Sequence, residues 1–215
     1  MTGPAAPRPP LPRGVRFAAA VAFLLSAVTG FFTLNEFAEL GHLSELRSAS
    51  GSQPFSVVGD PKLDAPIAQA WFSALEAMRE SRSLILGALL VAYALVFVSA
   101  GRMLRPEGIR LEGVRRLLGG SAIAVALLRT IDGAQLSVVA SRMGPALANA
   151  MRAVSGAQGP EAEAFESAAS LVTLSVALFT ALIAGTFALL GQYFRGERVR
   201  LAVLQQDASL AEEDE

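Results

Sequence analysis

Arg129 and Asp132 carry opposite charges inside an otherwise apolar stretch of the chain, and Gln135 follows at the same spacing. A charged side chain near the centre of a bilayer costs about 2.5 to 3.5 kcal/mol on insertion scales, so both charges should face away from lipid. Residues three apart lie on one face of a helix, and the sequence therefore predicts that Arg129 pairs with Asp132.

This intramembrane polar group of Arg129, Asp132 and Gln135 has two interpretations. It is either a structural pair that orients its helix, or a pathway or binding site for a proton, an ion or a small anion. Transport relays usually contain several such groups, so a third polar group or a water-lined cavity beside the pair would favour the pathway.

Three glutamates and a histidine follow the first apolar segment at steps of three: Glu36, Glu39, His42 and Glu45. Glu39 and His42 have the Glu-x-x-His spacing of di-iron bundles, which need a second such motif. His42 is the only histidine of the chain, so that second motif is missing. We therefore expect a solvated helical extension and no metal site, with Glu39 and His42 as weak candidates for a divalent cation.

The sequence lacks the motifs of the common enzyme classes. It contains no cysteine, no Gly-x-Ser-x-Gly elbow, no His-Glu-x-x-His and no phosphate-binding glycine loop. Asp132 also lacks the partner acid that an intramembrane acid-base enzyme would use. The formal net charge of -1 offers no basic surface for nucleic acid. We expect a non-enzymatic protein with no cofactor and no nucleic-acid partner.

The elements that must position these residues are apolar helices. Of the 215 residues, 53% are hydrophobic and 17% charged, and the mean hydropathy is +0.46. A spanning helix needs about 20 mostly apolar residues. Three segments meet this need: 17–34, 83–101 and 168–194. A fourth, 117–140, is long enough but contains Arg129 and Asp132, so it needs independent support. The expected fold is an all-α integral membrane protein, a four-transmembrane-helix bundle in the lipid bilayer.

The arginines predict the orientation of the bundle, because short cytoplasmic loops are rich in Lys and Arg. The loop at 102–116 contains five arginines, the one at 141–167 contains two, and the longer external loop 35–82 contains three arginines and one lysine. Without a span at 117–140, the arginines at 195–200 would lie outside. Both termini should therefore be cytoplasmic. The excess of arginine over lysine, with many alanines, is typical of a GC-rich bacterial genome and suggests a multi-pass protein of a bacterial inner membrane.

The segments outside the spans differ in character. The many prolines in 1–16 predict a disordered tail at the N-terminus. The charges in 195–215, basic and then acidic, predict a solvated tail at the C-terminus. The external loop 35–82 contains turn-forming residues at 48–66 and then an amphipathic helix near 64–78. A second short amphipathic helix is expected at 145–154.

Small residues recur every fourth position on two of the spans, a spacing that lets helix backbones approach closely. The first row is Ala18, Ala22, Ser26 and Gly30, and the second is Ala177, Ala181 and Gly185. They indicate helix contact faces. The expected function is association, as a homo-oligomer or with another membrane protein, through these faces and the external loop. The alternative is a small transporter or channel subunit that uses the polar group around Arg129 and Asp132.

Overall fold

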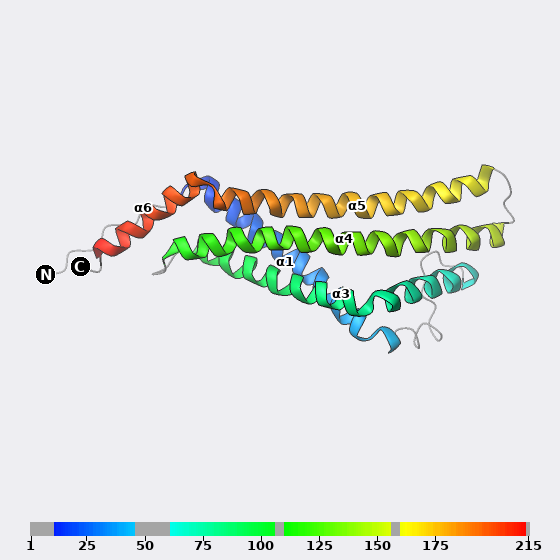
Figure 1. Ribbon diagram of the computed structural model, residues 1–215. Coiled ribbons are helices and arrows are strands. Elements are labelled where there is room, and N and C mark those ends of the chain that lie inside the picture. The colour runs from blue at the N-terminus through cyan, green and yellow to red at the C-terminus, as the bar shows by residue number, and fades with distance from the viewer. Residues whose placement is uncertain (1–10, 46–60, 106–109, 156–159, 214–215) are drawn as a thin grey trace. The chain divides into compact units, whose positions relative to one another are not determined.

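Every regular element in the part of the chain that the computed structural model describes is an α-helix (Figure 1). The structure describes residues 11–45, 61–105, 110–155 and 160–213. Its helices are α1 (Arg13–Gly41), α3 (Pro61–Leu104), α4 (Leu111–Ser155), α5 (Pro160–Arg195) and α6 (Glu197–Glu213). The predicted all-α fold class is confirmed for these residues.

Four of these helices are long and apolar enough to cross a membrane. The apolar segments are Arg13–Gly41, Ala68–Leu104, Leu111–Arg142 and Thr173–Arg195. Three predicted spans lie wholly within them, and the fourth begins five residues before Thr173. Large apolar side chains such as Leu178, which is 70% exposed, cover their outer surface. Contiguous exposed apolar surface is typical of a protein that meets lipid or another protein.

The two short amphipathic helices predicted from the sequence are not separate elements. The segment 64–78 is the beginning of α3, which has 44 residues, and 145–154 is the end of α4, which has 45 residues. No glycine or proline lies between Pro66 and Gly87, so nothing interrupts α3 before its apolar part. Once started, a helix gains one hydrogen bond per added residue, which favours continuation. At about 1.5 Å per residue both helices are far longer than the roughly 30 Å hydrocarbon core.

The described helices form two compact units. Apart from the ends that the structure does not describe, the first comprises residues up to 33, 88–128 and from 184 onward. Among the described residues, the second comprises 34–45, 61–87, 129–155 and 160–183. Each of α1, α3, α4 and α5 contributes a segment to both units. Arg129, Asp132 and Gln135 belong to the second unit.

In the first unit, aromatic and glycine contacts hold the helices together. The rings of Phe23 in α1 and Phe97 in α3 are stacked with centroids 4.2 Å apart. Between α4 and α5 the backbones approach closely, because a Cβ built at Gly191 would lie 3.0 Å from the carbonyl oxygen of Gly119. Two glycines facing each other remove the side chains that would otherwise separate the helices.

The predicted C-terminal tail is mostly helical where it is described. After a bend at Gly196 the chain forms α6, in which Val199 and Val203 are buried. The carboxylate of Asp207 accepts hydrogen bonds from the backbone N–H groups of Leu111 and Glu112, at 2.8 and 3.0 Å. These N–H groups lie in the first turn of α4, where no intrahelical acceptor exists. Asp207 thus caps α4, and the expectation that it is merely solvated is wrong. The predicted tail 1–16 lies mostly outside the described residues, as does most of 48–66.

Candidate functional site

Arg82 is the centre of a buried ionic cluster in the second unit. Its side chain, on α3, is fully buried and contacts carboxylates from two other helices. The Nη2 group donates a hydrogen bond to Oε1 of Glu36 on α1, and it lies 3.3 Å from Oδ1 of Asp132 on α4. Asp132 also accepts a hydrogen bond from Arg129 through its other oxygen. These four residues join three helices, and we call them the charge network.

The charge network contains two cations and two anions, so its net charge is zero. Asp132 and Arg82 are fully buried, Arg129 is 13% exposed, and Glu36 is 32% exposed. Moving charges out of water is unfavourable, and only close pairing and hydrogen bonding offset that cost. Mutual neutralisation therefore explains how an arginine and an aspartate are accommodated in the apolar part of α4.

Several polar atoms of this region have no hydrogen-bond partner among the described residues. They are Nε and Nη1 of Arg82, Nε of Arg129, Oδ1 of Asp132, and Oε1 of the neighbouring Gln135. Buried donors and acceptors are normally paired with protein atoms or ordered water. Both donors and acceptors are among these atoms. The site thus has more hydrogen-bonding capacity than its own side chains use.

Spacing along α4 predicts that Arg129 and Asp132 are neighbours, and the structure places them in contact. Spacing along one helix does not predict that Glu36 and Arg82 join this pair. We expected both residues in the external loop 35–82. A signal for them exists, because Glu36 follows the first apolar span and Arg82 precedes the second. In an up-and-down bundle both positions lie at the same end of the helices. Glu36 and Arg82 are therefore two further charged neighbours of Arg129 and Asp132 that the spacing along α4 could not identify.

The weak metal candidates Glu39 and His42 are exposed. The imidazole Nδ1 of His42 lies 3.0 Å from Oε2 of Glu45. Glu36 faces Arg82 and so does not extend this pair. Within the described ranges no group of three or more His, Cys, Asp or Glu side chains is arranged to hold a metal ion.

The two rows of small residues have different surroundings. On α1, Ala22 and Ser26 are buried and Ala18 is half-buried. A Cβ built at Gly30 would lie 3.4 Å from the Cβ of Tyr93, so α3 packs against this row in the first unit.

On α5, in contrast, Ala177, Ala181 and Gly185 are all exposed. Apart from its chain neighbours and the nearby backbone of α5, no described atom lies within 4 Å of a Cβ built at Gly185. The chain's own described helices therefore cover the first row and leave the second open.

Close packing of α4 on α5 in the second unit depends on Gly133. A Cβ built there would lie 2.1 Å from Cγ2 of Thr180 and 2.7 Å from its Cβ. The two rows of small residues do not include Gly133, although it follows Gly119 by two heptads, a spacing that keeps both on one seam of a helix pair.

Buried ionic clusters in membrane proteins serve as structural locks, proton relays or ligand sites, so the cluster alone does not define a function. No protein-family model, no curated protein and no solved structure matched this chain.

Proposed function

We propose that this chain is a non-enzymatic, multi-pass protein of a bacterial inner membrane that acts by helix association, most simply with a second copy of itself. The observation that supports this proposal is the difference in exposure between the two rows of small residues. α3 packs against the row on α1, whereas the row on α5 is exposed among leucines such as Leu178 and Leu182. Lipid-facing helix surfaces have no need of small residues, but helix contacts do.

Bulky substitutions in the open row test the association. Ala181→Leu and Gly185→Leu are expected to dissociate the assembly, because a leucine prevents backbone approach. Neither should unfold the monomer, since both positions are exposed. The measurement is molar mass in mild detergent by light scattering, with cross-linking in native membranes.

Gly120→Leu provides a matched control, because Gly120 is also exposed with nothing within 4 Å of its Cβ position, but it lies outside the row. It should leave the assembly intact. Unchanged assembly in both row variants would contradict the proposal, and so would a wild-type chain that is monomeric and cross-links to nothing.

We also propose that both termini lie in the cytoplasm. Its support is the distribution of exposed arginines, which are frequent at 102–116 and 195–200. Reporter fusions after Glu215 and within 48–66 should report opposite sides of the membrane. A C-terminal reporter on the periplasmic side would contradict the four-span topology.

A transporter or channel subunit is the second candidate function. The charge network favours it, because Glu36 and Arg82 bring the number of charged groups to four. The polar atoms of Arg82, Asp132 and Gln135 that lack partners among the described residues add positions for water. Several ionisable groups with access to water are typical of proton and ion pathways. Four spans are few for a complete transporter, so this function also requires assembly.

A further inference from the structure

Exposed arginines gather at one end of the first unit, where four helices begin or end. Figure 1 shows the start of α1, the end of α3, the start of α4 and the end of α5 together at this end. A Cβ built at Gly14 on α1 would lie 3.1 Å from the hydroxyl oxygen of Tyr193 on α5, and one built at Gly119 on α4 would lie 2.8 Å from Cγ of Arg195. We call the exposed arginines of these helix ends and of α6 without a side-chain partner the arginine belt: Arg13, Arg16, Arg102, Arg105, Arg195 and Arg198.

The acids of the first unit do not neutralise the arginine belt. Three acids of this unit have described side chains, and each is already engaged. Glu112 accepts hydrogen bonds from Arg115 and Arg116, Glu197 pairs with Arg200 at 3.2 Å, and Asp207 caps α4. The belt therefore carries positive charge that the described acids leave uncompensated.

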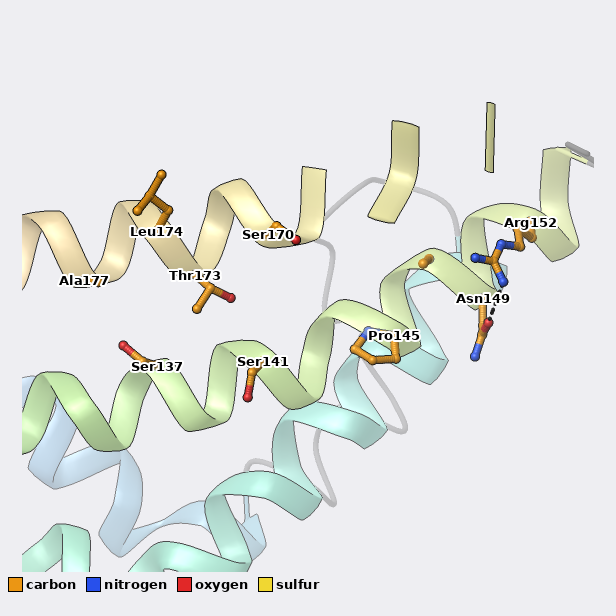
Figure 2. Close-up of a pocket in the computed structure, with 10 residues that line it drawn as sticks. Ser137, Ser141, Pro145, Asn149, Arg152, Ser170, Thr173, Leu174 and Ala177 are labelled. Atoms are coloured by element: carbon orange, nitrogen blue, oxygen red, sulfur yellow. Dashed lines mark hydrogen bonds between the residues drawn. The ribbon is translucent and has the colours of Figure 1, made fainter. Parts of the chain in front are cut away.

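Most described arginines of the second unit have partners. Arg82 pairs with a carboxylate inside the charge network. Arg79 donates a hydrogen bond to the carbonyl oxygen of Gly41 at 3.3 Å. Arg152 stands beside Asn149, with Nη1 3.5 Å from Oδ1 (Figure 2). Unpaired positive charge is thus concentrated in the first unit.

Apolar side chains are exposed next to the arginine belt. Phe17 follows Arg16 directly and is 72% exposed, and Tyr193, two positions before Arg195, is 41% exposed. A soluble anion would contact the guanidinium groups and leave these rings in water. A bilayer offers hydrocarbon to the rings and charged headgroups to the arginines, which is the usual arrangement of such residues at a membrane interface. The surroundings of the belt therefore favour a lipid surface as its partner.

We propose that the arginine belt binds the headgroups of anionic phospholipids. A guanidinium group presents its N–H donors in a planar fork that matches the oxygens of a phosphate, and its charge is attracted to an anionic leaflet. Topology alone needs the positive charge only during insertion, whereas headgroup binding requires the folded protein to select anionic over neutral lipid. The inference rests on the membrane location proposed above and not on helix association.

Lipid that co-purifies with the full-length protein tests this selection. The protein is reconstituted in vesicles of equal phosphatidylglycerol and phosphatidylcholine and extracted in a mild neutral detergent, and mass spectrometry measures the ratio of the retained lipids. Phosphatidylglycerol should be enriched about fivefold or more, the factor expected for one arginine near an anionic membrane surface. Washing with about 0.5 M NaCl should lower the enrichment, because salt screens exposed charges. A wild-type protein that retains the two lipids equally would overturn the proposal.

Two pairs of substitutions locate the binding residues. Arg13→Gln/Arg16→Gln and Arg195→Gln/Arg198→Gln each remove two belt charges and should lower the enrichment at least twofold. The four changes together should remove most of it. Lysine at the same four positions keeps the charge and should preserve most of the enrichment, which separates headgroup attraction from lost packing of the arginine side chains. A folded four-glutamine variant with wild-type enrichment would overturn the proposal.

Arg79→Gln/Arg142→Gln is the matched control, because it removes two exposed arginines from the second unit. It should retain the wild-type enrichment, and a loss equal to that of the belt variants would overturn the assignment to the first unit. Melting temperatures and a reporter after Glu215 establish that each variant is folded and inserted as the wild type is. Release of the wild-type chain from membranes by alkaline carbonate would contradict the proposed function, whereas a retained chain without lipid enrichment would contradict the belt alone.

Discussion

Arg82→Met is expected to lower the free energy of unfolding by about 3 to 5 kcal/mol, which is typical for loss of one partner of a buried ionic pair. Arg82 is fully buried, and Glu36 and Asp132 both lose the cation that they share. Methionine fills a similar volume without charge, so the loss reports the missing cation of Glu36 and Asp132, of which only Asp132 keeps a second partner, more than a cavity. Unfolding in mixed detergent micelles, followed by circular dichroism, gives the measurement.

The order of effects within the charge network is a sharper test than any single value. Arg129→Met should destabilise the protein less than Arg82→Met, because it leaves both carboxylates paired with Arg82, whereas Arg82→Met leaves Glu36 without its cation. If Arg129 and Asp132 formed an isolated pair, Arg129→Met would destabilise the protein more than Arg82→Met. Arg82→Met would then change the free energy of unfolding only slightly. Arg142→Met, at an exposed arginine of α4, is the control and should change stability by no more than about 0.5 kcal/mol.

Removing opposite charges together should restore stability. The double variant Glu36→Leu/Arg82→Met leaves Arg129 paired with Asp132 and the net charge at zero, so much of the lost stability should return. The complementary pair Arg129→Met/Asp132→Leu leaves Glu36 with Arg82 and should behave alike. Double variants less stable than both of their single variants would show that the paired residues are not partners.

The folded double variants also separate the two candidate functions. A structural network predicts that they retain whatever growth phenotype the wild-type gene supports. A proton or ion pathway predicts a folded protein that has lost it, because the ionisable groups are gone.

Gly133→Ala is expected to destabilise the protein by about 1 to 3 kcal/mol, the usual cost of overpacking. The added Cβ would lie 2.7 Å from the Cβ of Thr180, an atom that no side-chain rotation can move, so α4 and α5 must separate. This loss should exceed the gain of about 1 kcal/mol that alanine brings over glycine in a helix. Thermal unfolding in detergent measures the change.

Gly120→Ala is the matched control, because no described atom of another residue lies within 4 Å of its Cβ position. It should leave stability unchanged or raise it slightly, which is the opposite sign. Thr180→Gly in the Gly133→Ala background should recover part of the loss by removing the clashing side chain. Equal effects of alanine at 120 and 133 would contradict the close contact between α4 and α5.

The sequence by itself determined the helical class and the number of apolar helices. Length and composition decide whether a segment can cross a hydrocarbon core, and both are local properties. The same holds for the neighbours Arg129 and Asp132, because residues three apart on a helix always share a face. The row that includes Ala22 and Gly30 is local as well, although spacing alone does not say which helix packs on it.

Only the tertiary structure decided which charges meet. Glu36 and Arg82 are 46 positions apart in the chain and belong to helices whose relative rotation no local pattern specifies. For the same reason the sequence did not reveal that Gly133 faces Thr180. These contacts depend on how two helices rotate and slide against each other, and close packing and ion pairing between distant segments set that arrangement.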